Sequence, residues 1–524
     1  TILSSRLKDP LNSGGSGVTP ADMVNINTYF AIIDSHFSSI VSRVQALPPA
    51  ASGLDPRLGK LLTTVRTNMP KIIQGEQDAR AIITALPSLI GVGQPSTYML
   101  EVLDSTELRP GGGFLGNYGY LALSGGRMSG IHMQDVDLLD NNFKYGGGYI
   151  PIPPQYSWYT GFYSWGYRDS NLDADFPTSA QNGLNLYYRE GGTQQFQGVI
   201  AITPWLIEKA LALTGSITLP EYSPAVTVTA DNLVTQIHYH QLGAGTSGPD
   251  NKLDPICGSS YRKCFTAYLF KHFLAQAKTA LTSKFGAFGK LLIDSFHSKD
   301  IQIYLSKPSA EAVLSHYHVA STIEAPPQGD SLFIVDANVN GNKANNQIIY
   351  NVTDQVKIDT SGTATHHLVM SYSWPDTPFN RLNAYQFGPV LLYVDYLRVY
   401  VPPGANITSQ SGWQENGTSK GTPYDFGRED AGGYLDVYIG QTGTVTMDFT
   451  VPHAATHAGN AWYYTDLVQK QGGVTKPTDI EVSLPSCASV VGLKGFTTPS
   501  AHVASYKPAD GLARDESLEV DYTC

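Results

Sequence analysis

Charged side chains are scarce in this chain of 524 residues. They make up 15% of it, whereas about 25% is usual for a soluble domain. Acidic residues outnumber basic ones by 45 to 34, which gives a formal net charge of −11. Because lysines and arginines are the residues that bind the phosphates of a nucleic-acid backbone and this chain has few of them, we expect no nucleic-acid partner. Hydrophobic residues make up 42% of the chain, enough for a core, which excludes a disordered or fibrous protein.

Long apolar runs are also absent. The longest, residues 79–93, is 15 residues long and is interrupted by Pro87, whereas a helix that spans a bilayer needs about 20 apolar residues. We therefore expect no transmembrane segment in this chain. The first residue is Thr1 and no signal peptide is visible. This favours an extracellular or cell-surface protein whose N-terminal signal or anchor was removed before Thr1.

Cysteines are few: the chain has four, and no two of them form a Cys-x-x-Cys pair, so zinc-site spacing is absent. Four cysteines allow three disulfide pairings. The simplest is local, with Cys257–Cys264 closing one tight loop and Cys487–Cys524 fastening the C-terminal tail. Four unpaired buried thiols are the alternative. We expect disulfides, because the cysteines lie in loop-like sequence, and disulfides belong to oxidising compartments.

Hydrophobic periodicity divides the chain into parts. From Pro20 to Leu47 apolar residues recur at three- and four-residue spacings, which predicts an amphipathic helix capped by Thr19. A second helical stretch, 55–86, is interrupted by Pro70. Strands then alternate with helices, which indicates a mixed α/β sheet, and the last third is almost wholly strand with recurring turns, as in β-sandwiches. The predicted fold class is α+β and multidomain. Its parts are a helical hairpin (1–95), a mixed α/β domain (96–325), one or two β-sandwiches (326–485) and a disulfide-stapled tail (486–524).

One glycine-rich segment is suited to a ligand, Glu107-Leu-Arg-Pro-Gly-Gly-Gly-Phe114. Glycine lets a ligand approach the backbone closely, and the guanidinium of Arg109 can hold a phosphate or carboxylate with two donors. The candidate ligand-binding residues here are Arg109, Gly112 and Gly113. The glycine pattern also matches a dinucleotide fingerprint, but it leads into a predicted strand instead of a helix, which excludes that use.

A second segment, residues 167–180, is rich in acidic residues that alternate like the first half of a calcium loop. Ala174 and Ala180 replace the turn glycine and the bidentate glutamate of an EF-hand, which excludes that motif. A looser Mg²⁺ or Ca²⁺ site remains open, with Asp169, Asp173 and Asp175 as its candidate ligands. The alternative for both segments is structural: Arg109 and Arg168 pair with these carboxylates, and the glycines only make turns.

Together the segments resemble a bacterial envelope family whose domain has no assigned function. The likeness lies in Glu-Leu-Arg-Pro-x-Gly-Gly-Phe, in Arg-Asp-x-Asn-x-x-x-Asp-Phe-Pro-x-Ser-Ala, in Gly198-Val-Ile-Ala-Ile and in Gln469-Lys-Gln-Gly472, and it covers roughly residues 97–485. Members typically carry an N-terminal membrane anchor. Here Gly111 replaces the commoner Thr or Ser after Pro110.

Arg168-Asp169, a predicted helix that ends at Gly191-Gly192, and a strand–helix–glycine unit from Gly198 to Thr218 carry a further likeness. In these features the family is distantly similar to the LytR–CpsA–Psr phosphotransferases, which attach polyprenyl-pyrophosphate-linked glycopolymers to the cell wall. By this resemblance Arg109 and Arg168 form a pyrophosphate clamp, and Asp169, Asp173 and Asp175 bind the metal or act as the base. The run of basic residues that those enzymes place around the lipid phosphates is not evident in this sequence.

Two functions follow as expectations. The first is a self-associating structural or assembly protein of the bacterial envelope, such as a surface-layer, sheath or filament subunit. The second is an enzyme or a binding protein for envelope glycopolymers. We favour the first and a non-enzymatic role, because two arginines neutralise a pyrophosphate incompletely, whereas uncharged polar surfaces lose little on desolvation when subunits pack. Three glycosylation sequons give weak support for a secreted setting. They begin at Asn351, Asn406 and Asn416.

Overall fold

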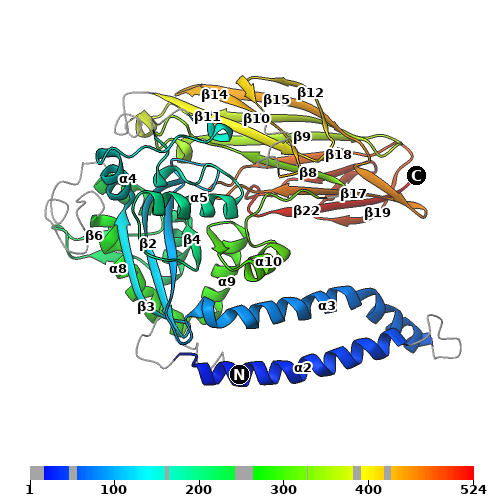
Figure 1. Cartoon of the computed structure of the whole chain (residues 1–524). Helices are drawn as coiled ribbons and strands as arrows, with labels where there is room; N and C mark the ends of the chain where they lie inside the picture. Colours follow the sequence, from blue (N-terminus) through cyan, green and yellow to red (C-terminus); the bar gives the residue numbers. More distant parts are fainter. Residues whose placement is uncertain are drawn as a thin grey trace.

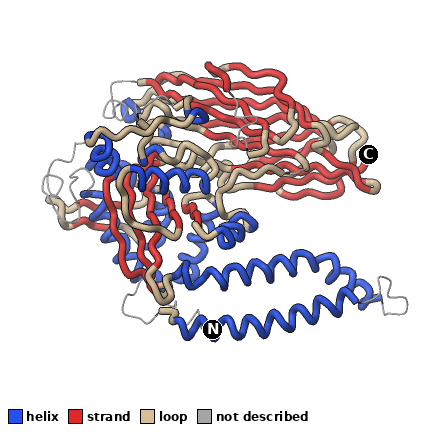
Figure 2. The backbone as a smooth tube through the Cα atoms, in the orientation of Figure 1, coloured by secondary structure: helices blue, strands red, loops and turns tan. Residues whose placement is uncertain are grey.

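A helical hairpin, an α/β domain and a two-sheet β-sandwich follow one another along the chain (Figure 1). This computed structural model describes residues 17–46, 56–159, 164–241, 264–326, 328–381, 391–417 and 426–524. Helix and strand are separated in space: the hairpin is all helix, the sandwich is nearly all strand, and the two mix only in the domain between them (Figure 2).

The hairpin consists of α2 (Pro20–Ala46) and α3 (Pro56–Ile90), which lie side by side. Thr19 caps α2 as predicted: its hydroxyl accepts the backbone N–H of Asp22 at 3.2 Å, and its own N–H donates to the Asp22 carboxylate at 3.0 Å. Helix α3 continues through Pro70, where the sequence predicts an interruption. The Tyr98 hydroxyl donates to the Leu89 carbonyl at 2.7 Å and ties the end of α3 to the α/β domain. Among the described residues, no helix has the length and apolar character needed to cross a membrane.

A five-stranded sheet with the order β3-β2-β1-β4-β7 forms the α/β domain. Only β1 and β4 are parallel neighbours. Strand β1 is buried on both faces: Met99 packs into the core that includes α5, whereas Leu100 packs into the core on the side of α6. The strands are β1 (Ser96–Asp104), β2 (Phe114–Ser124), β3 (Arg127–Asp135), β4 (Gly198–Ile202) and β7 (Ile301–Leu305), and a separate hairpin pairs β5 (Ile217–Leu219) with β6 (Val226–Val228). The helices are α4 (Val136–Tyr145), α5 (Phe176–Arg189), α6 (Pro204–Thr214), α7 (Leu233–Gln241), α8 (Cys264–Ser283), α9 (Phe285–His297) and α10 (Pro308–His316).

Two sheets pack face to face in the sandwich and share one continuous hydrophobic core, so the strand-rich region is a single sandwich. Alternation of buried and exposed residues along β9 and β10 is the pattern of strands with one face on the core. One sheet has the order β12-β15-β10-β9-β18-β21-β20 and the other β13-β14-β11-β8-β17-β22-β19, with β16 paired to β17. The strands are β8 (Asp330–Val335), β9 (Ile349–Ile358), β10 (Ala364–Ser373), β11 (Leu392–Val401), β12 (Asn406–Ser411), β13 (Gln414–Gly417), β14 (Glu429–Tyr438), β15 (Thr442–Val451), β16 (Ala455–Ala458), β17 (Ala461–Gln469), β18 (Thr478–Ser483), β19 (Ser489–Lys494), β20 (Thr497–Ser500), β21 (Val503–Tyr506) and β22 (Glu516–Thr523).

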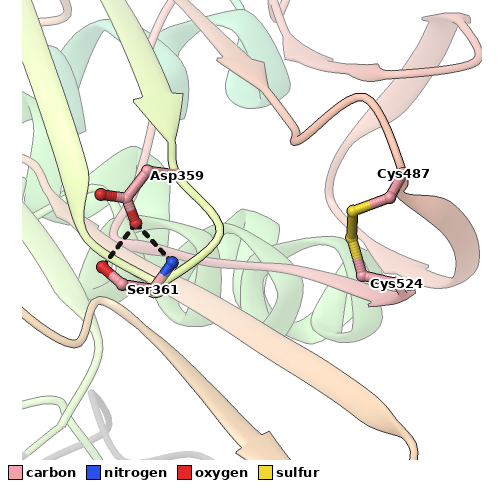
Figure 3. The surroundings of a disulfide bond; sticks show 4 residues. All are labelled: Asp359, Ser361, Cys487 and Cys524. Atoms are coloured by element: carbon pink, nitrogen blue, oxygen red, sulfur yellow. Dashed lines mark hydrogen bonds between the residues drawn. A yellow bond between two sulfur atoms is a disulfide. The ribbon is translucent and has the colours of Figure 1, made fainter.

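Residues 486–524, which the sequence sets apart as a tail, contribute β19 to β22 to both sheets. The Cys487–Cys524 disulfide is confirmed; it joins the segment before β19 to the end of β22, beside the turn at Asp359 and Ser361 (Figure 3). Cys264 is also disulfide-bonded, and its predicted partner, Cys257, lies outside the described residues. Of the sequons, Asn351 and Asn406 are exposed, and the side chain of Asn416 lies outside the described part.

Candidate functional site

Arg109 lies in the turn between β1 and β2, and its side chain is 1% exposed. Its guanidinium donates to the Glu107 carboxylate and to the Tyr159 hydroxyl, both at 2.8 Å. A third donor reaches the Asn338 carbonyl of the sandwich, also at 2.8 Å. Arg109 thus holds the α/β domain against the sandwich. Its Nε also lies 3.9 Å from Asp169 Oδ1, which agrees with the structural alternative that Arg109 pairs with a carboxylate of the acidic segment.

The neighbouring glycines serve close packing of backbone on backbone. A side chain at Gly113, where φ is +152°, would place its Cβ 2.6 Å from the backbone of Asp104. The Gly112 carbonyl accepts the Ser105 hydroxyl at 2.8 Å, and a Cβ at Gly473 of the sandwich would lie 2.0 Å from the same oxygen. These glycines therefore allow the backbone at the end of β1 and the backbone of the sandwich turn at Gly473 to pack closely together.

Arg168 is occupied by a different set of carboxylates. It pairs with Asp137 at 2.9 Å and with Asp140, both on α4, and its side chain is 21% exposed. Arg109 pairs instead with Glu107 in the β1–β2 turn. The two guanidiniums are therefore each neutralised by protein carboxylates, which leaves the predicted pyrophosphate clamp without support in the geometry.

The three candidate metal ligands each have another partner. Asp175 caps α5, accepting the Thr178 N–H at 3.1 Å, while Asp169 accepts the Tyr159 hydroxyl at 3.0 Å. Asp173 accepts the backbone N–H of Asp175 at 2.9 Å. Burial raises the pKa of both Asp169 and Asp173 to about 7. Within the described ranges, no three or more His, Cys, Asp or Glu side chains gather in a way that would hold a metal ion, so the predicted Mg²⁺ or Ca²⁺ site has no geometric support.

A polar cleft of about 370 Å³ lies where the α/β domain meets the sandwich. Ser105, which follows β1, lines it together with Trp205 and Lys209 of α6, the helix that follows β4. The carboxyl ends of parallel strands are where open α/β sheets bind ligands. The sandwich completes the wall with the segments around Asn345 and Lys470. We call this space the interdomain cleft.

Contacts across the domain boundary and within the α/β domain fix the side chains of the interdomain cleft. The Trp205 indole N–H donates to the Gly473 carbonyl at 2.8 Å. Lys209 Nζ lies 2.6 Å from Asp300 Oδ2, and the Thr203 hydroxyl donates to the other Asp300 oxygen at 3.0 Å. An aromatic ring and a charged pair are therefore held in place at the opening before any ligand arrives.

Lys470 is the most buried cation of the cleft, with 3% of its surface exposed. Its Nζ donates to the carbonyls of Ser298 and Gln471, each at 2.8 Å. Burial lowers the pKa of Lys470 to about 8. The surroundings of Lys470 therefore stabilise its protonated, charged form poorly.

A second cavity lies on the other side of α6, between the sheet and α8, but holds only about 70 Å³. Its walls are apolar, with Val102, Ile202, Ile207, Phe270 and Phe273 among the lining residues. Drug-sized ligands occupy roughly 300–1,000 Å³. This cavity is too small for a polyprenyl chain in the conformation described.

The functional candidates from sequence and from structure hardly overlap. Trp205, Lys209 and Asp300 were not singled out, although Pro204-Trp205 follows the apolar run that forms β4, a position where α/β ligands bind. Lys470 lies within the Gln469–Gly472 segment that carries part of the family resemblance. The position of Trp205 after a strand and the place of Lys470 in that segment were the sequence signals that could have pointed to the cleft.

Comparisons with known proteins cover parts of the chain. Residues 93–241 match the model of a family described as "Protein of unknown function (DUF4012)", which supports the resemblance to a family without assigned function over that range. No curated protein matches the chain in sequence. The family match includes both candidate segments and α6, but not the sandwich.

Solved structures resemble this chain only weakly. A Legionella pneumophila protein provisionally described as nutrient-binding is 11% identical, over 37% of this chain and 71% of its own, with a TM-score of 0.22. An M1 zinc metallopeptidase of Deinococcus radiodurans is 10% identical over 34% of this chain, with a TM-score of 0.19, and this chain spans 42% of its length. The Fcho1 Mu homology domain of Danio rerio is 10% identical, over 38% of this chain and 80% of its own, with a TM-score of 0.12. At such scores the likenesses carry no argument.

Proposed function

We propose that this protein binds glycans of the bacterial cell envelope and that the saccharide occupies the interdomain cleft. The observation that carries the proposal is the cleft itself. Its volume of about 370 Å³ falls within the roughly 300–1,000 Å³ of small-molecule sites. It lies at the carboxyl ends of β1 and β4 and combines an aromatic ring with polar side chains from two domains.

The chemistry of the cleft suits a sugar ring. A sugar presents an apolar face of C–H groups that packs on an aromatic ring, and hydroxyls that both donate and accept hydrogen bonds. Trp205 supplies the aromatic ring, and the Lys209–Asp300 pair offers a donor and an acceptor side by side. Asn346 and Thr475 add exposed polar groups at the sandwich wall.

Binding is a better match than group transfer. A pyrophosphate-transfer site needs free cations, whereas Arg109 and Arg168 both pair with carboxylates. The proposal therefore keeps the glycopolymer as ligand and does not include the phosphotransferase chemistry. An envelope setting is supported by the Cys487–Cys524 disulfide, since disulfides persist in oxidising compartments.

An array of neutral and acidic bacterial envelope oligosaccharides tests the proposal with the whole chain. We expect selective binding, weakened at least about tenfold by Trp205→Ala, a loss of about 1.4 kcal/mol. Asn346→Ala, at an exposed position of the same cleft, should weaken binding without touching the Trp205–Gly473 bond across the domains. Tyr145→Ala on α4 is the control, because Tyr145 is an exposed aromatic that does not line the cleft. An array with no bound glycan, or equal binding by all these variants, overturns the proposal.

Self-association is a second candidate function, favoured by one observation on the hairpin. Tyr29, Ile33 and Ile40 project from one side of α2 and are 62%, 61% and 57% exposed. We propose that a second copy covers this row, in an interface of more than about 1,000 Å². Sedimentation velocity should then show concentration-dependent oligomers that Ile33→Glu abolishes. A chain that stays monomeric at high concentration, with or without Ca²⁺, contradicts this candidate.

A further inference from the structure

We infer that the glycan of the interdomain cleft is acidic and that Lys470 binds its anionic group, a carboxylate or a phosphate. This inference rests on the proposed function and names the class of its ligand. Among the described residues that line the cleft, Lys470 is the cation without a carboxylate in contact, and the inference comes from this residue and from the arrangement of the charges around it.

Lys470 is buried as a cation without a counter-ion. In the described part of the chain, no carboxylate oxygen lies within 4.0 Å of its Nζ. Two of its three N–H donors go to the carbonyls of Ser298 and Gln471, which leaves one donor. Burying an unpaired charge is costly, and proteins normally pair such a charge or let it lose its proton. A lysine of this kind on the wall of a cleft is suited to an anion that arrives with the ligand.

The carboxylates near Lys470 are already engaged by other lysines. Lys299 pairs with Asp515 at 2.8 Å, and Lys209 pairs with Asp300 at 2.6 Å. These two pairs are neutral as units, so the ammonium of Lys470 remains in excess. Asp300 and Asp515 attract the charge of Lys470 from more than 4.0 Å away, whereas Lys299 and Lys209 repel it.

Glu208 is the remaining acidic residue of the cleft lining. Burial raises its pKa, and Asp231 and Asp300 raise it further, whereas Lys209 beside it opposes the rise. Glu208 therefore holds its proton more readily than an ordinary glutamate. An anionic ligand in the cleft thus meets one cation without a contacting carboxylate, the neutral Lys209–Asp300 pair and one carboxyl that is protonated more easily than usual.

The test compares matched glycans on the whole chain by isothermal titration calorimetry. Each uronate-bearing oligosaccharide of the array is paired with its carboxyl-reduced counterpart, which differs only in the acid group, and polyol-phosphate oligomers form a separate arm. We expect the acidic member to bind at least about tenfold more tightly than its neutral partner. Uronate binding assigns a carboxylate to Lys470, and binding of the polyol-phosphate arm alone assigns a phosphate.

Variants connect the preference to Lys470. Lys470→Gln should abolish the preference for the acidic member while the neutral member binds as before. Lys290→Gln, at a side chain 76% exposed on α9, should leave the preference intact. In the unaltered chain the preference should fall as the pH rises above about 8 and Lys470 loses its proton, a readout that does not depend on how well Lys470→Gln folds.

The outcomes separate the inference from the proposed function. Neutral glycans that bind as well as acidic ones, or a preference that survives in folded Lys470→Gln, overturn the inference and leave glycan binding standing. An array on which no glycan binds overturns both.

Discussion

Replacing Arg109 distinguishes a structural arginine from a ligand-binding one. Arg109→Met keeps most of the apolar stem and removes the guanidinium, which is 1% exposed and contacts Glu107, Tyr159 and the Asn338 carbonyl. If the guanidinium holds two domains together, its removal should lower the stability of the protein. If it binds a ligand, its removal should lower the affinity for that ligand and change the stability little.

The magnitude follows from what the substitution leaves behind. Removing one partner of a buried pair typically costs about 3–5 kcal/mol, because the other charge stays buried. Glu107 keeps a second cation, since Lys343 Nζ lies 3.2 Å from its other oxygen, so its charge is partly compensated. The Asn338 carbonyl loses the Arg109 donor. We expect a loss of about 3 kcal/mol, the lower end of the range, and, for an unfolding unit of the size of the α/β domain, a melting temperature lower by roughly 6–12 °C.

Differential scanning calorimetry on the whole chain measures the shift. Arg80→Met is the matched control, because Arg80 also pairs with two carboxylates, Asp34 and Glu76, but its side chain is 53% exposed on the hairpin. We expect it to melt close to the unaltered chain. An Arg109→Met chain that melts within a degree or two of the unaltered one, yet loses binding of a pyrophosphate probe, would refute this reasoning and restore the clamp.

Two further predictions concern buried titratable groups. Burial disfavours the charged form of His366, but Asp330 and Asp354, at 2.8 and 2.9 Å, together raise its pKa well above the ordinary value. This contribution to stability is complete below about pH 6.5 and is lost as the pH rises through the folded-state pKa, so His366→Gln should flatten the fall of melting temperature measured between pH 7 and 10. Burial also raises the pKa of Glu101 to about 7, and the hydrogen bond from the Tyr167 hydroxyl opposes this rise. The stability of the protein should therefore fall as the pH rises from about 4.5 to 7. In urea titrations at pH 8, Glu101→Gln should raise the free energy of unfolding by about 3 kcal/mol. Steeper pH dependence in either variant contradicts the corresponding assignment.

Features with a local signature could be predicted from the sequence. The apolar spacing of residues 20–47 and the Thr19 cap predict α2 almost to its ends, because helix periodicity and capping depend on residues three or four apart. Strand-like runs with recurring turn signals in the last third predict the sandwich, because these signals are also local in sequence. The Cys487–Cys524 pair followed from the simplest local pairing of four cysteines. Pro70 misled, because neighbouring turns of a long helix can absorb the one backbone bond that proline removes.

The candidate site could not be predicted in this way, because its residues meet only through the tertiary fold. Trp205 and Gly473 are 268 positions apart in sequence, and the bond between their indole and carbonyl groups forms only when the sandwich docks on α6. The same docking decides the role of Arg109: its donors are taken by Asn338, 229 positions away, as well as by the nearby Glu107. Motif spacing identified residues with suitable chemistry but gave no indication of which partners would already occupy them.

The scarcity of charged residues helps to explain why both arginines of the candidate segments are already paired with carboxylates. In a chain with 15% charged residues, a buried or half-buried cation that has a carboxylate within reach is expected to be paired with it, since an unpaired one costs stability. Arg109, which is buried, and Arg168, which is half-buried, are both paired in this way. For both arginines the geometry therefore supports a structural role. The same reasoning makes Lys470 informative: it is buried and lines a cleft, yet within the described ranges only backbone carbonyls accept hydrogen bonds from its ammonium. The free-energy cost of burying such a charge beside an open cleft is better explained by a ligand that neutralises the charge than by packing alone.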